Sequence, residues 1–293
     1  MSTPINGKKI QQEFISKLQK YAHLFFDTYV FIFVPRPGEK GASEAYISAK
    51  EKQKAFQLIG FKCLIFVPNS SEMLEFNYKK NNRIFFIMQR PLNTHSTILP
   101  DVIKWVNLDT LDSAEKKISA VSETAHKIIK PFLEKNTKNP PLLHKIGLVG
   151  SNGFFGAEIS TLLNKYPVEI LNLDIGSNLF QLSDVDIVIS AVGKKNLILP
   201  KHLYTHKKLL IDVGFQYDES VNQGFGDFSQ SCYEYSTFHT PVPGGIGPLQ
   251  VLTLLERAAL TFEIKTYKPW SALKADVSKN KNLNTNSEKT MII

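Results

Sequence analysis

The chain has 293 residues, a formal charge of +8, a hydrophobic fraction of 43% and only two cysteines. This length can bury a sizeable core and exceeds the usual size of one domain, so we expect two domains. The sequence has no apolar run of eighteen residues and no signal-type N-terminus, which predicts a soluble cytoplasmic protein without a membrane segment. Because Cys63 and Cys232 lie far apart and outside any Cys/His cluster, we expect reduced packing residues and no metal site.

The positive charge is spread along the chain, and no block of five or six like charges occurs. Nucleic-acid binding through a basic surface is therefore an alternative supported by net charge alone, and we expect no nucleic-acid partner. A moderate positive balance also suits small anionic ligands, such as a dinucleotide pyrophosphate or a substrate that carries carboxylates.

The first half of the chain alternates helices with apolar strands. Residues 29–34 form a continuous β-branched and aromatic run that stops at Pro35-Arg-Pro-Gly38, as expected of a strand buried on both faces of a parallel sheet. The alternation predicts a βαβαβ domain with crossover helices. The expected elements are helix 7–24, strand 29–34, helix 43–59, strand 62–67, helix 70–82 and strand 83–88.

A second alternation follows a long helical stretch and a polar linker that contains prolines. It is typical of a Rossmann-like dinucleotide-binding fold, so the sequence predicts a two-domain α/β protein whose C-terminal helix packs back on the first domain. The expected elements are helix 113–135, linker 136–141, strand 145–149, helix 155–165, strands 168–173, 186–190 and 208–212, and helix 250–265. The predicted domains are 1–135 with 249–270, a Rossmann-like domain at 141–248, and a disordered tail at 271–293.

Residues 240–249 read Thr-Pro-Val-Pro-Gly-Gly-Ile-Gly-Pro-Leu and run directly into the last predicted helix. Proline fixes φ, glycine lets the backbone approach a ligand, and a helix start presents N–H groups, so the string predicts a ligand-binding turn; a simple helix cap is the alternative. The string resembles the signature of the bifunctional methylenetetrahydrofolate dehydrogenase/methenyltetrahydrofolate cyclohydrolase family. The resemblance implies substrate contacts at Pro241, Pro243, Gly244 and Gly245, and cofactor contacts at Thr240 and Gly247.

The helix expected at 43–59 contains a second match. Ala42-Ser-Glu-Ala-Tyr46-Ile-Ser-Ala-Lys50 is similar to the Ala-Ser-x-x-Tyr-Val-x-x-Lys helix of the family. The spacing of four places Tyr46 and Lys50 on one helical face, where the phenol can stack on a pterin and a lysine of lowered pKa can transfer a proton. Gly60 lies two residues farther from Lys50 than the family pattern has it, so Lys52 and Lys54 are alternatives for the catalytic lysine. A surface helix with a solvated lysine is the non-catalytic alternative.

Two further positions of the first domain follow from the resemblance. Gln89 falls where the family reads Gln-Leu-Pro-Leu-Pro, and its amide is implied to orient the lysine and the substrate. Asp112, in Asp109-Thr-Leu-Asp112, echoes the family's pterin-binding aspartate. The family's Pro-Cys-Thr-Pro segment has no counterpart here. A nucleotide-binding sensor or partner protein that has lost folate chemistry is therefore a second hypothesis.

The turn after strand 145–149 reads Gly150-Ser-Asn-Gly-Phe-Phe-Gly156. It is similar to the Gly-x-Ser-x-x-x-Gly turn of the family, with Asn152 in place of the serine, and glycines at such a strand-to-helix turn can cradle a pyrophosphate. Asp212-Val-Gly214 and Gly226-Asp227 match two later turns of the family. The resemblance implies cofactor contacts at Gly150, Ser151, Asn152, Gly156, Ala191, Val192, Gly193 and Gly214.

Asp174 follows strand 168–173, where an acidic side chain in a dinucleotide fold accepts hydrogen bonds from ribose hydroxyls. A carboxylate there repels a 2′-phosphate, and Ser151 stands where NADP-using members of the family have an arginine. We therefore expect NAD rather than NADP, although Lys194 and Lys195 could restore phosphate binding.

The resemblance implies hydride transfer from 5,10-methylenetetrahydrofolate to NAD or NADP in one-carbon metabolism. Hydrolysis of the methenyl product to 10-formyltetrahydrofolate is implied as a second activity of the same protein. The family resemblance alone suggests a homodimer.

Overall fold

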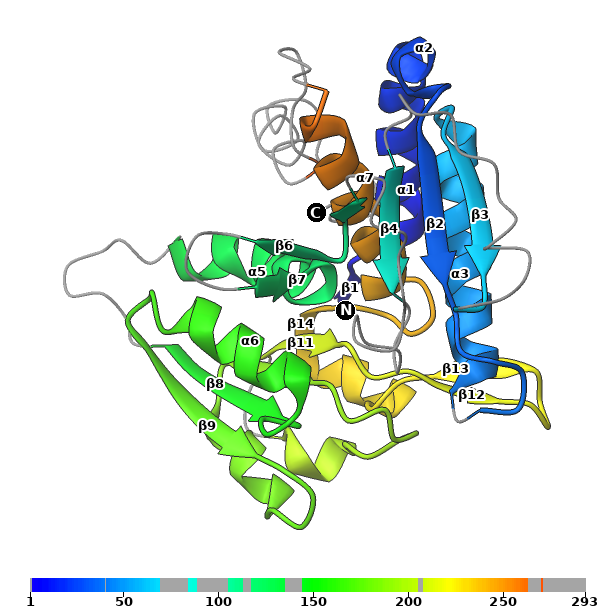
Figure 1. The fold of residues 1–293 in the computed structure, drawn as a ribbon. Helices are drawn as coiled ribbons and strands as arrows, with labels where there is room; N and C mark the ends of the chain where they lie inside the picture. Colours follow the sequence, from blue (N-terminus) through cyan, green and yellow to red (C-terminus); the bar gives the residue numbers. More distant parts are fainter. Residues whose placement is uncertain are drawn as a thin grey trace, which may run out of the picture. The chain divides into compact units, whose positions relative to one another are not determined.

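The computed structural model describes residues 2–39, 41–68, 84–88, 105–112, 117–134, 144–204, 208–262 and 270. The chain forms two compact units, each with its own parallel sheet (Figure 1). Unit 1 comprises residues 1–10, 121–253 and 268–293, and unit 2 comprises residues 11–120 and 254–267. The predicted two-domain α/β fold is confirmed.

Unit 2 is built on a four-stranded parallel sheet in the order β3-β2-β4-β5. The strands predicted from apolar runs occur because such runs can be buried on both faces of a parallel sheet, and residues 30–33 are completely buried. The short strand β5 at the edge was not expected. The bounds are β2 (Tyr29–Phe33), β3 (Lys62–Phe66), β4 (Ile84–Met88) and β5 (Trp105–Asn107).

The helices α1 (Gly7–Leu18) and α3 (Ala42–Leu58) supply most of the helical structure of unit 2. The predicted helix 7–24 is divided, because the backbone at Tyr21 leaves helical angles with φ −105° and ψ 10°. The 3-10 helix η1 (Gln19–Tyr21) and the short helix α2 (Ala22–Phe25) complete this stretch. Helix α3 packs along β3 and β2.

An aromatic cluster forms part of the core of unit 2. The ring of Phe25 stacks on Phe61 at 4.6 Å between centroids, and Phe262 meets Phe25 edge-on at 5.0 Å. Phe262 also lies 6.4 Å from Phe85 of β4. These contacts, worth about 1 kcal/mol per pair beyond area burial, hold the end of the last helix in unit 2. The prediction that the C-terminal helix packs on the first domain is thereby confirmed.

The prediction of one helix over residues 113–135 is partly wrong. Helix α5 (Ala120–Glu134) begins later, and the preceding residues form the antiparallel pair β6 (Thr110–Asp112) and β7 (Lys117–Ser119). Pairing of Leu111 with Ile118 and of Thr110 with Ser119 satisfies the backbone locally. The polar, lysine-rich composition that suggested a helix is therefore overridden by cross-strand pairing.

Unit 1 contains a six-stranded, wholly parallel sheet in the order β1-β14-β11-β10-β8-β9. The four strands predicted for the Rossmann-like domain occur within one residue of their expected limits. Two strands, the edge strand β1 and its neighbour β14, were not expected. The bounds are β1 (Thr3–Pro4), β8 (His144–Val149), β9 (Val168–Leu173), β10 (Ile187–Ser190), β11 (Lys208–Asp212) and β14 (Ser236–His239).

Helices cover the sheet of unit 1 (Figure 1). Two further strands, β12 and β13, form a separate antiparallel pair. The core contains residues of strands and 3-10 helices, among them Leu182, Leu210 and Phe228. The predicted helix 250–265 begins earlier and ends sooner, as α7. The bounds are α6 (Phe154–Leu163), η3 (Leu179–Asp184), η4 (Pro200–His202), β12 (Gln216–Asp218), β13 (Gln223–Phe225), η5 (Gln230–Tyr235) and α7 (Ile246–Leu260).

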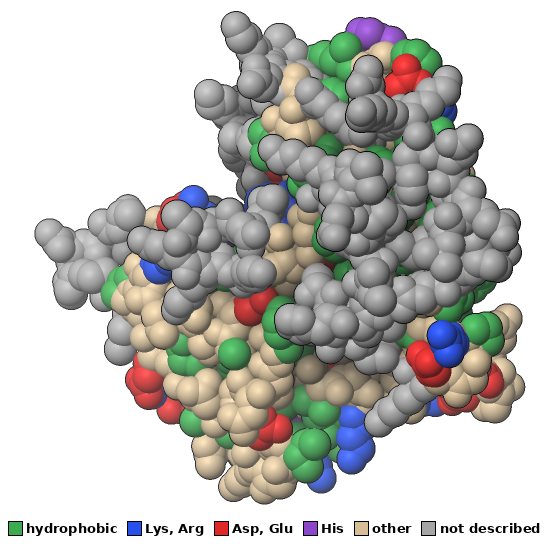
Figure 2. Space-filling model, in the orientation of Figure 1, with side chains coloured by type: hydrophobic (Ala, Val, Ile, Leu, Met, Phe, Trp, Pro, Cys, Tyr) green, Lys and Arg blue, Asp and Glu red, His purple; other side chains and the backbone are tan. Residues whose placement is uncertain are grey.

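Both cysteines are free and buried. Burial raises the pKa of each thiol, so the thiols remain protonated and serve as packing groups. Within the residues that the structure describes, no helix is long and apolar enough to cross a membrane, and no group of three His, Cys, Asp or Glu could hold a metal ion. On the face drawn in Figure 2, the lysine and arginine side chains among the described residues stand apart from one another.

The units divide the chain differently from the predicted domains. Helix α5 and the first half of α7 group with the Rossmann-like sheet, and residues 1–10 join them. The predicted helix 70–82, linker 136–141 and tail 271–293 lie outside the described residues.

Candidate functional site

The proline-glycine turn of residues 240–247 joins β14 to α7 in unit 1. The peptide bond between Val242 and Pro243 is cis, and Gly244 has a φ of +111°, which only glycine adopts easily. The N–H of Gly245 donates to the carbonyl oxygen of Pro241 at 2.7 Å, and the buried Thr240 hydroxyl accepts from the N–H of Asp212 at 2.7 Å. The structure thus uses Thr240 and Gly245 to fix the turn.

The outer positions of the turn are open. Pro243 and Gly247 are exposed, and a Cβ built at Gly247 would meet no atom within 4 Å. Of the six turn residues expected to contact ligands, these two present the most surface. Contacts with substrate or cofactor at any of the six remain predictions.

The amino-terminal segment supports this turn. A Cβ at Gly7 would lie 2.1 Å from the carbonyl oxygen of Gly245 and 2.8 Å from that of Gly244, so only glycine fits beneath the turn. Strand β1 pairs with β14 just before it, and the N–H of Ile5 donates to the carbonyl oxygen of His239 at 2.7 Å. Residues 3–7 therefore form one side of the turn's framework.

Helix α3 of unit 2 places its lysines on different faces. Tyr46 is 48% exposed, and the exposed Lys50 points its ammonium over the Tyr46 ring at 5.4 Å from the centroid. Lys54 is also exposed, whereas Lys52 is only 3% exposed. The spacing of four that groups Tyr46 with Lys50 is borne out, but this face of the helix is the solvated one.

Lys52 has the properties of a proton-transferring group. Its ammonium donates to the Ser48 hydroxyl oxygen at 2.6 Å, one helical turn earlier. Burial lowers the pKa of Lys52 to about 8, while the charges of Asp109 and Glu51 act in the opposite direction. A lysine with such a pKa can give and take protons near neutral pH.

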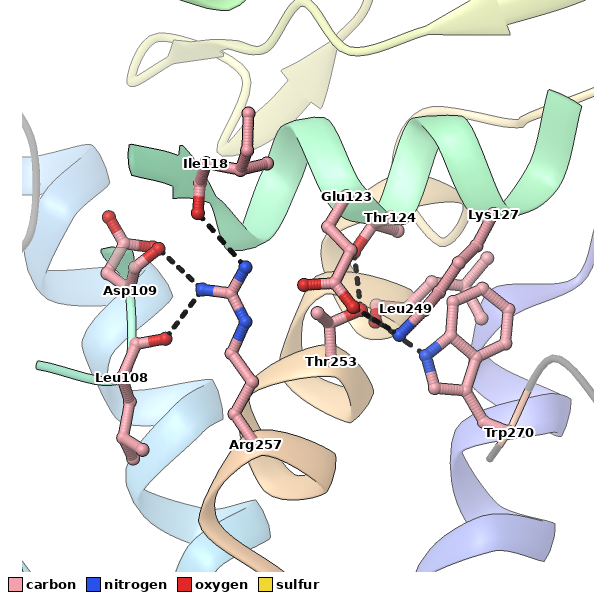
Figure 3. A network of polar contacts seen from close by, with 10 residues as sticks. All are labelled: Leu108, Asp109, Ile118, Glu123, Thr124, Lys127, Leu249, Thr253, Arg257 and Trp270. Atoms are coloured by element: carbon pink, nitrogen blue, oxygen red, sulfur yellow. Dashed lines mark hydrogen bonds and ion pairs between the residues drawn. The ribbon is translucent and has the colours of Figure 1, made fainter. Parts of the chain in front are cut away.

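Asp109 follows β5 and lies in a tightly held corner of unit 2 (Figure 3). The side chain of Asn107 accepts from the N–H groups of Asp109 and Thr110 at 2.9 and 3.2 Å. The carbonyl oxygen of Asp109 accepts from Ala120 N–H at 2.8 Å and from the Arg257 guanidinium at 2.7 Å. The backbone that carries the Asp109 carboxylate is therefore fixed on both sides.

Arg257, near the end of α7, is the centre of this corner. It is only 3% exposed, and its guanidinium also donates to the carbonyl oxygens of Leu108 at 2.8 Å and Ile118 at 3.0 Å. One side chain thus joins the end of β5 to β7 (Figure 3). Neither Arg257 nor Asp109 was identified from the sequence, because these contacts link residues about 140 or more positions apart.

A second group of side chains in Figure 3 belongs to unit 1. The hydroxyl groups of Thr124 and Thr253 lie 2.7 Å apart, and Thr253 Oγ1 accepts from the indole N–H of Trp270 at 3.3 Å. On the same side of α5, Lys127 pairs with Glu123 at 2.5 Å. These contacts explain why α5 groups with the first half of α7.

Two predicted positions of the first domain lie beyond what the structure describes. Gln89 is outside the described residues. Asp112 ends β6, but its side chain is not described. Their expected roles remain predictions, while Asp109, three residues before Asp112, is the carboxylate whose charge acts on Lys52.

In unit 1, the glycine turn between β8 and α6 has little room for side chains. Gly150 has a φ of +89°, and a Cβ at Gly156 would lie 2.4 Å from the carbonyl oxygen of Gly150. The N–H groups of Gly150 and Ser151 donate to the carbonyl oxygen of Leu173 at 2.9 and 3.2 Å. The turn at the start of α6 therefore depends on its glycines, and its contact with a pyrophosphate remains a prediction.

Asp174 is held beside this turn. Its carboxylate accepts from the N–H of Asn152 at 2.9 Å and from the N–H of Ile175 at 2.8 Å. The hydrogen bond from Asn152, followed by that from Ile175, lowers the pKa of Asp174. The side chain is therefore a fixed negative charge next to the glycine turn.

The two lysines considered for phosphate binding, Lys194 and Lys195, differ in how their side chains are held. Lys195 lies 3.6 Å from the centre of the Phe225 ring and pairs with Asp218 at 3.2 Å. Lys194 is exposed, and its N–H donates to Asp227 at 2.7 Å. Because Lys195 is engaged in unit 1 itself, it is a poor candidate for restoring phosphate binding.

A pair of buried carboxylates organises the strand-end loops of unit 1. Asp227 accepts from the Ser190 hydroxyl at 2.6 Å and from the N–H groups of Val192 and Lys194 at 2.8 and 2.7 Å. A Cβ at Gly214 would lie 2.2 Å from the Asp227 carboxyl carbon. Asp227 thus shapes the loop of Ala191, Val192 and Gly193 and the Asp212-Val-Gly214 turn.

Asp212 lies against the same corner and accepts from the N–H groups of Asp227 and Phe228, each at 3.2 Å. Burial, followed by the charge of Asp227, raises the pKa of Asp212 to about 8. The folded state therefore holds this proton more tightly than the unfolded chain does. The resulting stabilisation is fully present below about pH 4 and is lost as the pH rises toward 8.

We predict that Asp212→Asn removes this pH dependence. Relative to the parent chain, the variant gains about 1–3 kcal/mol of unfolding free energy between pH 5 and pH 8, because asparagine has no proton for the unfolded chain to release in this range. Thermal or urea unfolding at several pH values measures this gain. The control is Asp27→Asn, which alters an exposed carboxylate; a gain that does not depend on pH would contradict the prediction.

The sheet of unit 1, with its glycine turn and its acidic residue after β9, defines a dinucleotide-binding α/β protein. Residues 123–266 match the family model for the NAD(P)-binding domain of tetrahydrofolate dehydrogenase/cyclohydrolase. The bifunctional protein FolD of Borrelia garinii subsp. bavariensis is 28% identical over 283 residues, covering 87% of this chain and 91% of that protein. The second half of the chain is thus similar to the tetrahydrofolate dehydrogenase/cyclohydrolase family, and most of its length is similar to bifunctional FolD proteins.

Solved structures share the fold. The bifunctional enzyme FolD of Campylobacter jejuni is 21% identical with a TM-score of 0.68, and the alignment covers 90% of this chain and 100% of that chain. The FolD of Trypanosoma brucei, solved with NADP cofactor and an inhibitor, is 19% identical with a TM-score of 0.67, covering 91% and 99%.

Proposed function

We propose that the protein oxidises 5,10-methylenetetrahydrofolate with NAD or NADP and hydrolyses the 5,10-methenyltetrahydrofolate product to 10-formyltetrahydrofolate, in one-carbon metabolism. The observation that carries the proposal is the similarity to bifunctional FolD proteins, which extends over both units of the chain. The buried Lys52 and the glycine turn supply the two kinds of group that this chemistry needs.

The two reactions differ in whether they need a group of the protein that takes up a proton. The nicotinamide, when bound, accepts a hydride from the methylene carbon, which leaves the methenyl cation. Hydrolysis then adds water to the same carbon, opens the ring to the formyl compound and releases one proton. Only the second step requires a group that takes a proton, so the lysine matters most there.

The residues present fit a nicotinamide dinucleotide, because Gly150, Gly153 and Gly156 carry no side chains at the turn that begins α6. This turn would hold the pyrophosphate, and the Asp174 carboxylate would accept from the ribose hydroxyls. Ser151, Asn152, Ala191, Val192, Gly193 and Gly214 stay proposed cofactor contacts.

On the folate side, we assign proton transfer to Lys52 rather than Lys50. Lys52 is buried, and its pKa of about 8 leaves a substantial neutral fraction near physiological pH, whereas Lys50 is exposed. Asp109 is the carboxylate near this lysine and takes the place given to Asp112 as an anchor for the cationic substrate. Tyr46 as a stacking platform and Gln89 as an orienting amide stay proposals.

We propose NAD as the preferred cofactor, because the Asp174 carboxylate is fixed where a 2′-phosphate would be repelled. We predict that Asp174→Ser lowers the ratio of kcat/KM for NAD to that for NADP by about tenfold or more, because the serine removes the carboxylate that repels a 2′-phosphate. Initial rates with each cofactor measure the ratio. The exposed Asp184→Ser is the control, and an unchanged ratio in Asp174→Ser would refute the assignment.

One assay tests the function as a whole. Purified protein is mixed with methylenetetrahydrofolate and either NAD or NADP, and reduced nicotinamide and methenyltetrahydrofolate are followed by absorbance. Turnover supports the enzyme. Cofactor binding without turnover would support a non-catalytic relative instead, and the absence of both, with salt-dependent DNA retention, would support a nucleic-acid-binding protein. The cytoplasmic location and the homodimer remain part of the proposal.

A further inference from the structure

Ser48 and Lys52 form a pair on helix α3. They are four residues apart, so their side chains lie on one face of the helix. The Lys52 ammonium donates to the Ser48 hydroxyl oxygen at 2.6 Å, and Ser48 itself is half-buried. This is a short, charge-assisted hydrogen bond on a buried lysine.

The phenol of Tyr46 is in no position to hold Lys52. Six residues separate them, which rotates their side chains by about 240° around the helix axis. Tyr46 instead lies under the Lys50 ammonium on the exposed face. Among the contacts of the described residues, a serine hydroxyl is the side-chain group that bonds the buried lysine.

A hydroxyl suits a lysine that changes its protonation state. It accepts a hydrogen bond from the ammonium, and it can rotate its own hydrogen to donate to the neutral amine. The amine nitrogen, at the end of a flexible four-carbon chain, is thus held in one place in both states. Without the hydroxyl, the neutral amine loses a donor and the ammonium loses an acceptor.

We propose that Ser48 is the positioning residue of Lys52: its hydroxyl fixes the lysine nitrogen for proton transfer in the hydrolysis step. The inference rests on the proposed function for its catalytic consequence. The position of the lysine nitrogen itself does not depend on that function, since it follows from the Ser48–Lys52 geometry.

Within the part of the chain that the structure describes, two carboxylates act on the charge of Lys52. Asp109, after β5, and Glu51, on α3 itself, both favour the ammonium. Of the titratable groups on β2 and β3, Tyr29 lies under the Lys62 ammonium at 5.2 Å, Lys62 is exposed and paired with Asp27, and Cys63 is a buried protonated thiol. None of these groups changes when Ser48 is replaced.

The test compares Ser48→Ala with Ser48→Thr, which keeps the hydroxyl. Loss of the acceptor favours the neutral amine, so in Ser48→Ala the midpoint for Lys52 titration falls by about one pH unit, and kcat for hydrolysis falls about tenfold while KM stays within about twofold. Ser48→Thr restores both values. The control is Ser16→Ala, which removes an exposed helix hydroxyl that bonds to the Gln12 carbonyl oxygen and leaves both values unchanged.

The titration is read in the protein without substrate, from the 13C shift of the Lys52 Cε carbon, assigned by its loss in Lys52→Arg. An unchanged Lys52 midpoint in folded Ser48→Ala, or the same shift in Ser16→Ala, would overturn the inference. If Ser48→Ala does not fold, a midpoint in Ser48→Thr equal to that of the parent chain supports the inference, and a midpoint at least one unit lower overturns it. A parent chain without turnover would reject the proposed function, while the titration would still decide the role of Ser48.

Discussion

Lys52→Met abolishes most of the hydrolysis of methenyltetrahydrofolate, by a factor of about 10² to 10⁴, which is the usual contribution of a positioned acid–base group. Oxidation of methylenetetrahydrofolate falls much less, because hydride transfer moves no proton. The measurement is the initial rate of methenyl absorbance loss for hydrolysis, and of reduced nicotinamide formation for oxidation. The expected result is a separation of the two activities.

Two further variants make this result specific. Lys50→Met keeps hydrolysis near the parent rate, since Lys50 is exposed and bonds only weakly to Gln53 at 3.5 Å. Lys52→Arg keeps the positive charge, but a guanidinium does not give up a proton near neutral pH, so we expect this variant to hydrolyse as slowly as Lys52→Met. Loss of hydrolysis in Lys50→Met with retention in Lys52→Met would place the chemistry on the Tyr46 face of α3.

Arg257→Leu lowers the free energy of unfolding by about 3 kcal/mol or more. The substitution removes the guanidinium from the carbonyl oxygens of Leu108 and Ile118, while Asp109 keeps its bond from the Ala120 N–H. Each buried acceptor left unsatisfied costs about 1–3 kcal/mol. Urea unfolding followed by circular dichroism measures the loss. Arg257→Lys recovers only part of it, because an ammonium lacks the planar fork that reaches three oxygens.

The matched control for Arg257 is Arg36→Leu. Arg36 is exposed and lies in the same unit, so its replacement changes stability by no more than about 0.5 kcal/mol. Equal stability of the Arg257→Leu and Arg36→Leu variants would show that the buried guanidinium contributes nothing.

The strands and the glycine turns could be predicted from the sequence, because the local residue pattern there matches the burial and the backbone angles of the folded chain. The run from Tyr29 to Phe33 is apolar at every position, as a strand covered on both faces must be, and residues 168–173 form a strand with the predicted limits. The turn at Gly150 was recognisable because positive φ and close packing demand glycine at fixed spacing.

The sequence did not show which of Lys50, Lys52 and Lys54 is the buried lysine. All three lie on one helix that is charged on several sides, and only the packing against the rest of unit 2 distinguishes the buried one. The misfit at Gly60 was the available signal. The hydrogen bonds around Asp109 could not be predicted from the sequence, because Arg257 bonds to Leu108 across a separation of 149 residues.

The first seven residues affect how any fragment of this protein folds. They supply the outermost strand of the Rossmann-like sheet and the glycine that fits under the turn at Gly245, 238 positions later. A piece that begins after them, such as the stretch 123–266 alone, would leave β14 as a bare sheet edge open to pairing with other chains. The beginning of the polypeptide is thus part of the folding unit formed by its second half.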